Sequence, residues 1–366
     1  MDASAVRKPS CTSFASSMQE PQELEAAAHD IYRAHILQIA YSFMSSRILF
    51  TAIKLDLFTL LDSHPLRVEQ IKDSLGVNGR GLRAFLDALT ALGLLKHAAG
   101  AYRATEAAKR YLSATSSQYI GPQMVMLSEL AYKSWGQLDA ALVSGLPQSM
   151  GTRGASIYDM LPHHPPALKI FMAGMAARSR AIGVHLARHF PWGEYGSVAD
   201  IGAANGEVLI QILRKHEHLR GIGLDLPHVE PFFSETVALL PSSVQARIRF
   251  QGGDFFSNGL ARADVVIFGH VLHNWSDWQR RLLLQLAYEC ISPGGRVIIY
   301  EAFVQPYRAE LFSQQMSLTM LLETCGGEEF TSAACADWLV GAGFQYPHIA
   351  DLPWPDKMVT AVRPQR

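Results

Sequence analysis

The sequence predicts an α/β protein whose second half is a doubly wound, mostly parallel sheet and whose first half is helical. Two observations predict this fold class. From about residue 197 onwards, short apolar runs alternate with helical patterns, and several runs end in a glycine turn or an acidic residue. Before about residue 113 the apolar positions instead repeat at helical spacing. A chain of 366 residues is long enough for about two domains.

The chain divides into four predicted segments. Residues 1–22 are polar and lack an apolar block, so we expect a mobile arm rather than a signal peptide. A winged-helix-like domain is predicted at 23–116, followed by a helical linker at 117–190 that prolines punctuate. The sheet domain is predicted at 191–366.

Charge is nearly balanced, with 32 Lys and Arg against 33 Asp and Glu. This balance lacks the electrostatic footprint of a protein that binds nucleic acid or a membrane surface. No apolar run is expected to reach the length of a membrane span. Cys11, Cys290, Cys325 and Cys335 are too widely spaced to indicate a disulfide framework or a metal site. We therefore expect a cytoplasmic protein whose partners are small molecules and another protein surface.

The second segment has the pattern of a winged helix. A short helix is predicted from Val68, a second one from Gly81, and two short strands around Gly100. Such a domain can bind DNA, and a ligand-sensing DNA-binding regulator is the remote alternative. Arg80 and Arg83 are the only basic residues at the start of the second helix, whereas phosphate binding needs a denser basic face.

The stretch from Ile31 to Leu61 is too apolar for a helix with one free face. Burial against a second copy of the chain would account for this composition. An ordinary core within one chain is the alternative.

Soft apolar side chains gather in the linker and late in the sheet domain. Methionine adapts to irregular apolar space and to flat aromatic ligands, so these residues are candidates for a ligand pocket, with core packing as the alternative for each. The candidates, together with one acidic residue, are Met126, Met172, Met175, Met316, Met320 and Glu323.

An aspartate-led glycine turn predicts a site for a nucleotide-like cofactor. Asp200, Gly202 and Gly206 follow one apolar run, and Asp225 ends the next. This is the layout of a strand, a tight turn at a helix start, and a second strand whose carboxylate can accept ribose hydroxyls. With only two glycines, the turn is a weak match to a dinucleotide fingerprint.

Further residues that bear useful chemistry fall at or just after predicted strand ends. Ligands of open α/β sheets bind beyond the carboxyl ends of the strands, so residues far apart in sequence become neighbours there. The set is Gly202, Asp225, Asp254, Phe255, His273 and Glu301.

Four motifs in this order, at 200–206, 252–256, 270–277 and 293–301, resemble those of the class I S-adenosylmethionine-dependent methyltransferases. The chain is similar to small-molecule O-methyltransferases of the caffeate and acetylserotonin type over about residues 25–363. The resemblance implies a Rossmann-like methyltransferase sheet with an N-terminal all-α winged-helix-like dimerisation domain. It also implies a homodimer that uses S-adenosylmethionine, releases S-adenosylhomocysteine and methylates a small-molecule acceptor.

The resemblance also assigns contacts to the cofactor. It implies that the turn with Gly202 faces the methionine portion, that Asp225 holds the ribose hydroxyls, and that Asp254 and Phe255 bracket the adenine. A helix cap is the alternative role for Asp225, and core packing is the alternative for Phe255. The full set of candidates is Asp200, Gly202, Gly206, Asp225, Leu226, Asp254, Phe255 and Trp275.

His273 is the candidate general base. A phenol with a pKa of about 10 is protonated near neutral pH, and a histidine with a reference pKa near 6.5 can accept its proton. By resemblance, Glu301 and Glu329 flank the imidazole, with Glu328 or Glu323 as substitutes for the second. No metal is implied, because a histidine rather than a carboxylate cluster stands at the transfer position.

The predicted activity is methylation of a phenolic hydroxyl on a small aromatic metabolite, and His270 is expected to be a strand-end core histidine. Three departures from the family pattern bear on this prediction. Ala203 and Ala204 stand where relatives commonly have further glycines, and Gly269 stands where plant relatives have a lysine. A Cβ atom in the turn narrows the allowed backbone conformations. C- or N-methyl transfer, and a cofactor-retaining cyclase that transfers no methyl group, therefore stay open.

Overall fold

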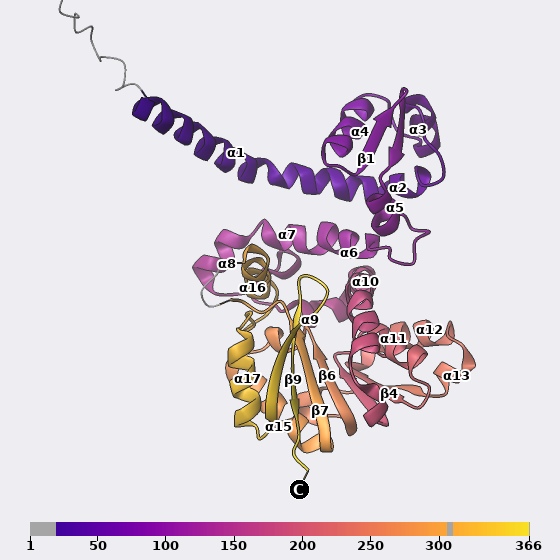
Figure 1. Ribbon diagram of the computed structural model, residues 1–366, viewed down its shortest axis with the longest axis vertical. Coiled ribbons are helices and arrows are strands. Elements are labelled where there is room, and N and C mark those ends of the chain that lie inside the picture. The colour runs from indigo at the N-terminus through magenta and orange to yellow at the C-terminus, as the bar shows by residue number, and fades with distance from the viewer. Residues whose placement is uncertain (1–19, 306–309, 366) are drawn as a thin grey trace, which may run out of the picture.

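The computed structural model describes residues 20–305 and 310–365, in an N-terminal lobe, a layer of linking helices and a sheet domain (Figure 1). The predicted arm lies outside the described residues except for its last three, which begin α1. The N-terminal lobe contains α1 (Glu20–Lys54), α2 (Leu57–Leu60), α3 (Val68–Leu75), α4 (Leu82–Ala91), β1 (Leu95–Ala98), β2 (Ala101–Ala104) and α5 (Glu106–Leu112).

Local sequence signals explain the compact part of this lobe. The Gln70 side chain accepts the backbone N–H of Arg67 at 2.8 Å and so fixes the start of α3. Strands β1 and β2 pair antiparallel through a turn at Gly100, whose φ of +76° suits glycine. Thr105 accepts the N–H of Ala108 at the start of α5. The helices and ribbon predicted from Val68 onwards are therefore present.

Helix α1 contradicts one expectation from the sequence. Its segment Asp30–Lys54 is long and apolar enough to cross a bilayer by length and composition alone, so the prediction that no run reaches this length was wrong. In the single chain most of this segment is uncovered, with Ile31, Ile36 and Ile39 at least 61% exposed. An exposed apolar surface of this kind needs a cover that one chain does not supply.

The linking layer lies between the lobe and the sheet domain (Figure 1). Its longest helix, α10, packs against α6 on one side and α11 of the sheet domain on the other, so it connects the two halves. The layer contains α6 (Gly121–Met126), η1 (Leu127–Ala131), α7 (Tyr132–Trp135), α8 (Leu138–Ser144), η2 (Ser149–Gly151), α9 (Ile157–Met160), η3 (Leu161–His163), α10 (Pro165–His189) and η4 (Trp192–Glu194).

The sheet domain confirms the doubly wound, mostly parallel prediction. Seven strands lie in the order β5-β4-β3-β6-β7-β9-β8, with the first five parallel and the last two joined antiparallel at one edge. Because β3 pairs with both β4 and β6, the strand order reverses beside it, where open α/β sheets bind ligands. The strands are β3 (Ser197–Ile201), β4 (Arg220–Asp225), β5 (Ile248–Gly252), β6 (Ala263–Gly269), β7 (Ile291–Glu301), β8 (Gln345–Asp351) and β9 (Lys357–Val362).

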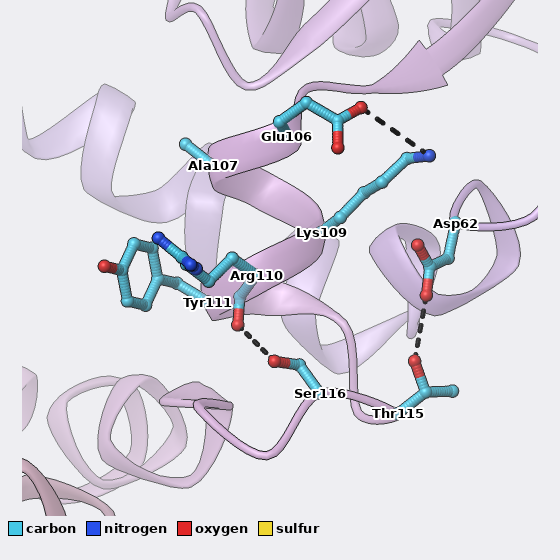
Figure 2. Close-up of a pocket in the computed structure, with 8 residues that line it drawn as sticks. All are labelled: Asp62, Glu106, Ala107, Lys109, Arg110, Tyr111, Thr115 and Ser116. Atoms are coloured by element: carbon cyan, nitrogen blue, oxygen red, sulfur yellow. Dashed lines mark hydrogen bonds and ion pairs between the residues drawn. The ribbon is translucent and has the colours of Figure 1, made fainter.

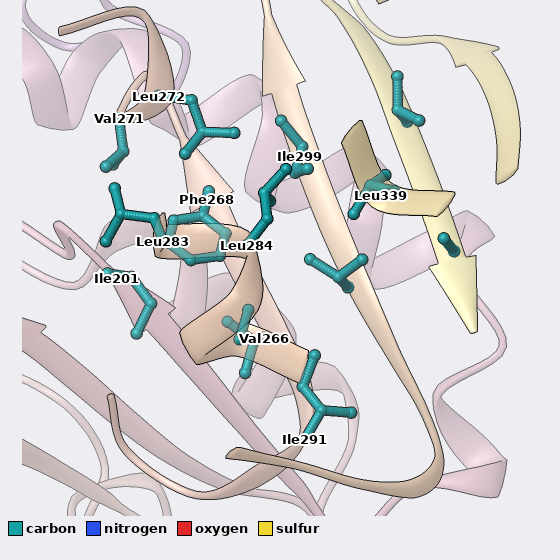
Figure 3. Close-up of a cluster of buried hydrophobic side chains, with 14 of the residues drawn as sticks. Ile201, Val266, Phe268, Val271, Leu272, Leu283, Leu284, Ile291, Ile299 and Leu339 are labelled. Carbon is teal, nitrogen blue, oxygen red and sulfur yellow. The ribbon is translucent and has the colours of Figure 1, made fainter. Parts of the chain in front are cut away.

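Helices cover both faces of this sheet. On one face, α15 and α17 bury leucines against strand residues such as Val266 and Ile299 (Figure 3). On the other, α11, α12 and the end of α10 pack against Val265 and Ile267. Alternate residues of β6 thus face opposite layers, as a strand buried on both sides requires. The helices are α11 (Glu207–Lys215), η5 (Pro227–Val229), α12 (Glu230–Ala238), α13 (Ser242–Gln245), α14 (Phe255–Asn258), η6 (Leu272–Asn274), α15 (Asp277–Cys290), α16 (Leu311–Glu323) and α17 (Ser332–Gly341).

Gly269 ends β6 for a packing reason. It pairs in register with Tyr300 of β7, and the Tyr300 ring occupies the space that a Cβ atom on Gly269 would take. The same ring stands edge-on against His270, with 5.2 Å between the ring centroids. A lysine at this position, as in plant relatives, would displace the ring. Gly269, which stands where plant relatives have a lysine, therefore fits this structure because the Tyr300 ring fills the space beside it.

Replacing Gly269 by alanine is expected to lower the free energy of unfolding by about 1–3 kcal/mol, because the Tyr300 ring must leave its place. Urea unfolding measures the change. Gly341→Ala is the control, because nothing lies within 4 Å of its added Cβ and its φ is not left-handed; the control is expected to be neutral or slightly stabilising. Equal unfolding free energies for the two variants would contradict the packing role.

Candidate active site

A cavity of about 400 Å³ opens beyond the carboxyl ends of the parallel strands. Its floor comes from the segments after β3, β4, β5 and β6, and its other walls come from α9 and α10 of the linking layer. Sequence-predicted residues that line it are Met172, Met175, Gly202, Asp225, Leu226, Asp254, Phe255 and Trp275. Of the six residues predicted to meet at the strand ends, Gly202, Asp225, Asp254 and Phe255 line this cavity, and His273 and Glu301 do not.

A second hollow, of about 670 Å³, lies on the N-terminal lobe beside α5 (Figure 2). Several of its polar groups are paired with one another. Lys109 Nζ lies 3.8 Å from Glu106 Oε1, and the Thr115 hydroxyl donates to Asp62 at 2.8 Å. None of the residues predicted as functional lines it. The candidate site is therefore the cavity at the strand ends.

The glycine turn after β3 forms one wall. Gly202 has a φ of +72°, and a Cβ there would lie 2.7 Å from Val271 Cγ2. Gly206 has a φ of +82° at the start of α11, and a Cβ there would meet the Phe233 ring at 2.7 Å. Ala204 also has a positive φ, +48°, although it is not glycine. This conformation costs about 1–3 kcal/mol for a residue with a Cβ atom. An alanine in place of the glycine common in relatives therefore introduces backbone strain at this turn.

Asp225 closes the turn from the end of β4. Its Oδ2 accepts the N–H of Ala204 at 2.7 Å, and its Oδ1 accepts the N–H of Leu226 at 2.7 Å. Burial raises the pKa of Asp225 to about 6, although these two hydrogen bonds oppose the rise. Each oxygen keeps a further lone pair for a ligand in the cavity. Asp200 lies behind the wall rather than in it, and burial beside Asp225 raises its pKa to about 8.

Aromatic side chains form the wall beyond β5. The Phe256 and Trp275 rings stand edge-on at 4.8 Å between centroids, and Phe255 and Trp275 do so at 5.7 Å. Asp254 accepts the N–H of Phe256 at 2.9 Å and caps α14. The Trp275 Nε1–H is buried without a hydrogen-bond partner among the described residues. A flat ligand with a hydrogen-bond acceptor at its edge suits this wall.

His273 lies in η6, in the turn that follows β6, and its ring is buried. Its Nδ1 lies 2.7 Å from Glu329 Oε1 and 3.3 Å from Glu301 Oε2, and its backbone N–H donates to Glu301 Oε1 at 3.3 Å. Two carboxylates at Nδ1 favour a proton on that nitrogen and a lone pair on Nε2. Among the described residues, the hydrogen bond of this ring is made by Nδ1 and leaves Nε2 unpaired. That nitrogen can therefore accept a proton.

A second histidine shares the same carboxylate. His270 lines the cavity with a φ of +54°, and its Nδ1 lies 3.4 Å from Glu301 Oε2. Its Nε2 lies 3.2 Å from Asp356 Oδ2, and an Arg178 nitrogen lies 3.3 Å from its Nδ1. His270 is buried at the end of a strand, as the sequence predicted. The sequence did not predict that its ring lies among charged groups and faces the cavity.

The charges of this cluster compensate one another. Burial and the Arg178 guanidinium lower the pKa of His270, but Asp356 and Glu301 outweigh them and raise it to about 9. Burial opposes ionisation of Glu301, yet the charges of His273 and His270 hold its pKa below the usual range. The ligand atoms of His270, His273 and Glu301 lie within 4.8 Å of one another, a spacing that could hold a metal ion. Within this cluster, His270 Nε2 and Glu301 Oε2 have no hydrogen-bond partner among the described residues, although a carboxylate and the two imidazoles lie within 3.4 Å of them.

Arg280 of α15 holds the histidine turn in place. Its Nε donates to the backbone carbonyl of Leu272 at 3.0 Å, and its NH2 group donates to the carbonyl of Glu328 at 2.7 Å. Its guanidinium also stacks over the Phe330 ring, 4.7 Å from the centroid. The turn with His273 is thereby tied to the loop with Glu329. The predicted capping pair at the start of α15 is also present, since the Ser276 N–H donates to Gln279 Oε1 at 3.1 Å.

Several predicted residues lie elsewhere or behind the cavity wall. Glu328 is exposed and lies near Arg280 rather than His273. Glu323 is buried, and its burial raises its pKa to about 7. Met126 instead packs against the cluster around Leu168. Those that do not line the cavity are Met126, Asp200, Gly206, His273, Glu301, Met316, Met320, Glu323 and Glu329.

Sequence reasoning also missed part of the lining. The linking layer contributes an aromatic pair, Tyr158 and Phe171, with 6.2 Å between edge-on rings. Burial raises the pKa of Tyr158 well above its usual value, so its hydroxyl stays protonated. Phe171 precedes Met172 on α10, so the run of residues that predicted Met172 could also have predicted Phe171. No sequence pattern indicated Tyr158. The missed residues are Tyr158, Asp159, Leu161, Leu168, Phe171, His228, Val229, Gly253, Phe256, Gly269, His270, Val271 and Asn274.

Comparisons with known proteins agree with this architecture. The chain matches the models of an O-methyltransferase domain at 135–345 and an O-methyltransferase dimerisation domain at 37–114. It is 37% identical over 334 residues to the tetracenomycin polyketide synthesis 8-O-methyl transferase of Streptomyces glaucescens, which spans 90% of this chain and 96% of that protein. It is 34% identical over 272 residues to an N,N-dimethyltransferase of Streptomyces rimosus, which spans 74% of this chain and 78% of that protein.

Solved structures show the same fold. The human N-acetylserotonin methyltransferase, crystallised in complex with S-adenosylmethionine, superimposes with a TM-score of 0.81. The match covers 96% of this chain and 99% of that chain at 24% sequence identity. A likeness at this identity speaks to the arrangement of the elements and not to their chemistry.

Replacing Arg280 by methionine is expected to lower the free energy of unfolding by about 2–5 kcal/mol, because a buried carbonyl (Leu272) and a part-buried one (Glu328) lose their donor. Urea unfolding measures this effect. Arg281→Met is the matched control: it lies next along α15, also stacks near Trp338, and makes only an exposed pair with Asp277. A surface pair contributes about 0–1 kcal/mol. Similar losses in both variants would contradict the role given to Arg280.

Proposed function

The chain belongs to the O-methyltransferase family, and from this premise we propose that it methylates a phenolic hydroxyl of a polycyclic aromatic metabolite with S-adenosylmethionine as methyl donor. The observation that carries the proposal is the geometry of His273. Its Nδ1 is held by two buried carboxylates while its Nε2 has no partner among the described residues. The acceptor class follows from the aromatic and methionine walls and from the named role of the Streptomyces glaucescens relative.

The cavity has the groups that S-adenosylmethionine needs. Asp225 offers two carboxylate lone pairs for ribose hydroxyls, and a charged acceptor makes these hydrogen bonds strong. The wall of Phe255 and Trp275 suits the adenine, whose ring nitrogens can accept the unpartnered Nε1–H of Trp275. Gly202 lets the methionine portion approach the backbone. When bound, the cofactor supplies a methyl group on a positively charged sulfur.

The chain then has two tasks, which are to position the acceptor and to take its proton. Nε2 of His273 would accept the phenolic proton, so that the acceptor oxygen can take the methyl group and leave the cofactor as a neutral thioether. The positive charge that develops on the imidazole faces Glu329 and Glu301. Holding the acceptor oxygen in line with the methyl–sulfur bond, within reach of the base, would supply a further rate advantage.

We also propose that the enzyme works as a homodimer. The dimerisation-domain match begins within α1 and covers the rest of the N-terminal lobe. Helix α1 exposes Ile31, Ile36 and Ile39, which a second copy of the chain would cover. This explains the apolar stretch of the sequence without a membrane.

N-methyl transfer is the second candidate, because one relative is named an N,N-dimethyltransferase. The deciding experiment incubates the purified protein with methyl-labelled S-adenosylmethionine and a panel of polycyclic phenols and matched aromatic amines. Label on oxygen, located by mass fragmentation, supports the proposal. Label on nitrogen or carbon overturns its O-selectivity, and tight cofactor binding without transfer to any acceptor favours a non-methylating cyclase.

Replacing His273 by alanine is expected to lower kcat by about 100- to 10,000-fold, because the phenol loses its base. Affinity for S-adenosylmethionine, measured by calorimetry, is expected to change less than about twofold, since His273 is no cofactor ligand in this proposal. His348→Ala, at an exposed position of β8, is the control and keeps full activity. Loss of turnover and affinity together would place His273 in cofactor binding or folding instead.

Replacing Asp225 by alanine is expected to weaken S-adenosylhomocysteine binding by about 10- to 100-fold, because charge-assisted hydrogen bonds to the ribose are lost. In the unmodified protein, binding is expected to weaken as the pH falls through about 6, since the carboxylate becomes protonated there. Asp225→Asn keeps the shape without the charge and is expected to bind weakly at every pH. Calorimetry between pH 5 and pH 8, an interval of about one to two units around that pKa, checks both statements. Unchanged affinity in the alanine variant would remove Asp225 from this role.

A further inference from the structure

The turn between β8 and β9 reaches into the charge cluster beneath the cavity. It spans residues 352–356 and is closed by a hydrogen bond from the Leu352 N–H to the Asp356 carbonyl at 3.1 Å. The Asp356 side chain is buried, and its Oδ2 lies 3.2 Å from His270 Nε2. The turn at one edge of the sheet thus places a buried carboxylate beside His270, which lines the cavity.

His270 stands between this carboxylate and a second one. Its two ring nitrogens face Asp356 on one side and Glu301 on the other, at 3.2 and 3.4 Å. Arg178 of α10 contributes a further positive charge, 3.7 Å from Asp356. With His270 charged, Arg178 and His270 together offset the charges of Asp356 and Glu301, while Glu329 faces His273. With His270 neutral, one of the first two carboxylates would lose its compensating charge.

Glu301 is shared between the two histidines. Its Oε2 lies 3.4 Å from His270 Nδ1 and 3.3 Å from His273 Nδ1. A positive charge on His270 offsets part of the Glu301 charge that would otherwise act on His273. The charged or titratable groups that face the two rings from all packed elements are Arg178, Tyr300, Glu301, Glu323, Glu329 and Asp356.

We propose that Asp356 is a positioning residue for methyl transfer: by keeping His270 charged, it limits how strongly Glu301 holds a proton on His273. The proposal rests on His273 being the base, as proposed above. It adds that a carboxylate outside contact with the base controls the charge that stands beside it, on His270. The β8–β9 turn thereby belongs to the catalytic machinery.

The sign of the effect follows from the charges. Without the Asp356 carboxylate, burial and Arg178 favour neutral His270. Glu301 then acts on His273 alone and stabilises its protonated form. A protonated His273 cannot accept the phenolic proton, so activity requires a higher pH.

The test compares the pH dependence of kcat/KM for the unmodified enzyme and for Asp356→Asn. We expect the acidic limb to move to higher pH by about one unit, so that the rate below the limb falls about tenfold while the alkaline plateau is retained. Asp351→Asn is the control on the same hairpin, because that side chain is exposed and pairs only with Lys357. A limb that stays in place, moves to lower pH, or moves equally in the control would overturn the proposal.

Two further measurements protect the test against a folding defect. His270→Gln removes the same charge and is expected to give the same shift, and the double variant is expected to shift no further than either single one. NMR of histidine labelled with nitrogen-15 in the unmodified protein reports the state of His270 directly. Protonation of both ring nitrogens at pH 7.5, well above the ordinary histidine pKa of about 6.5, is expected, and a neutral ring would overturn the proposal.

The outcome is separable from the proposed function. If His273→Ala retains turnover, the assignment of the base fails whatever the state of His270. If His273→Ala is inactive and the limb of Asp356→Asn does not move, the base stands and the role of Asp356 fails.

Discussion

The site depends on one buried carboxylate. Glu301 ends β7 with no exposed surface, and it faces the rings of His270 and His273 and the backbone N–H of the latter. A buried carboxylate is tolerated only where charges and donors compensate it. Meeting that requirement draws the turn after β6 against the end of β7. The position of the candidate base is therefore set by the sheet and not by a free loop.

Packing around the carboxylate serves the same arrangement. Gly269 leaves room for the Tyr300 ring, which packs edge-on against the His270 ring. Arg280 ties the turn with His273 to the loop that contains Glu329 through hydrogen bonds to two backbone carbonyls. Two elements distant in sequence thus meet at one imidazole. Strain at Ala204 is tolerated because its N–H is fixed by a buried carboxylate.

The sequence predicted the sheet and the residues at its strand ends, because apolar runs followed by Asp225, His273 and Glu301 are local signals. Placement of the linking layer is not local, so Tyr158 in the cavity wall gave no signal, and methionines such as Met316 were predicted to line the cavity but do not. Asp356 was missed for the same reason. Its partners lie in the turn after β6 and on α10, and only the folded edge of the sheet brings them together.

The two halves of the cavity differ in how they are held. The groups proposed for the cofactor and for proton transfer lie at the ends of strands, which packing on both sheet faces makes rigid. The acceptor side is formed by α9 and α10, and α10 also packs on α6 next to the lobe with the exposed apolar helix. Covering α1 with a second chain would therefore steady the acceptor wall as well as bury apolar surface. A change confined to this linking layer would reshape the side proposed for the acceptor and leave the charge cluster at the strand ends in place.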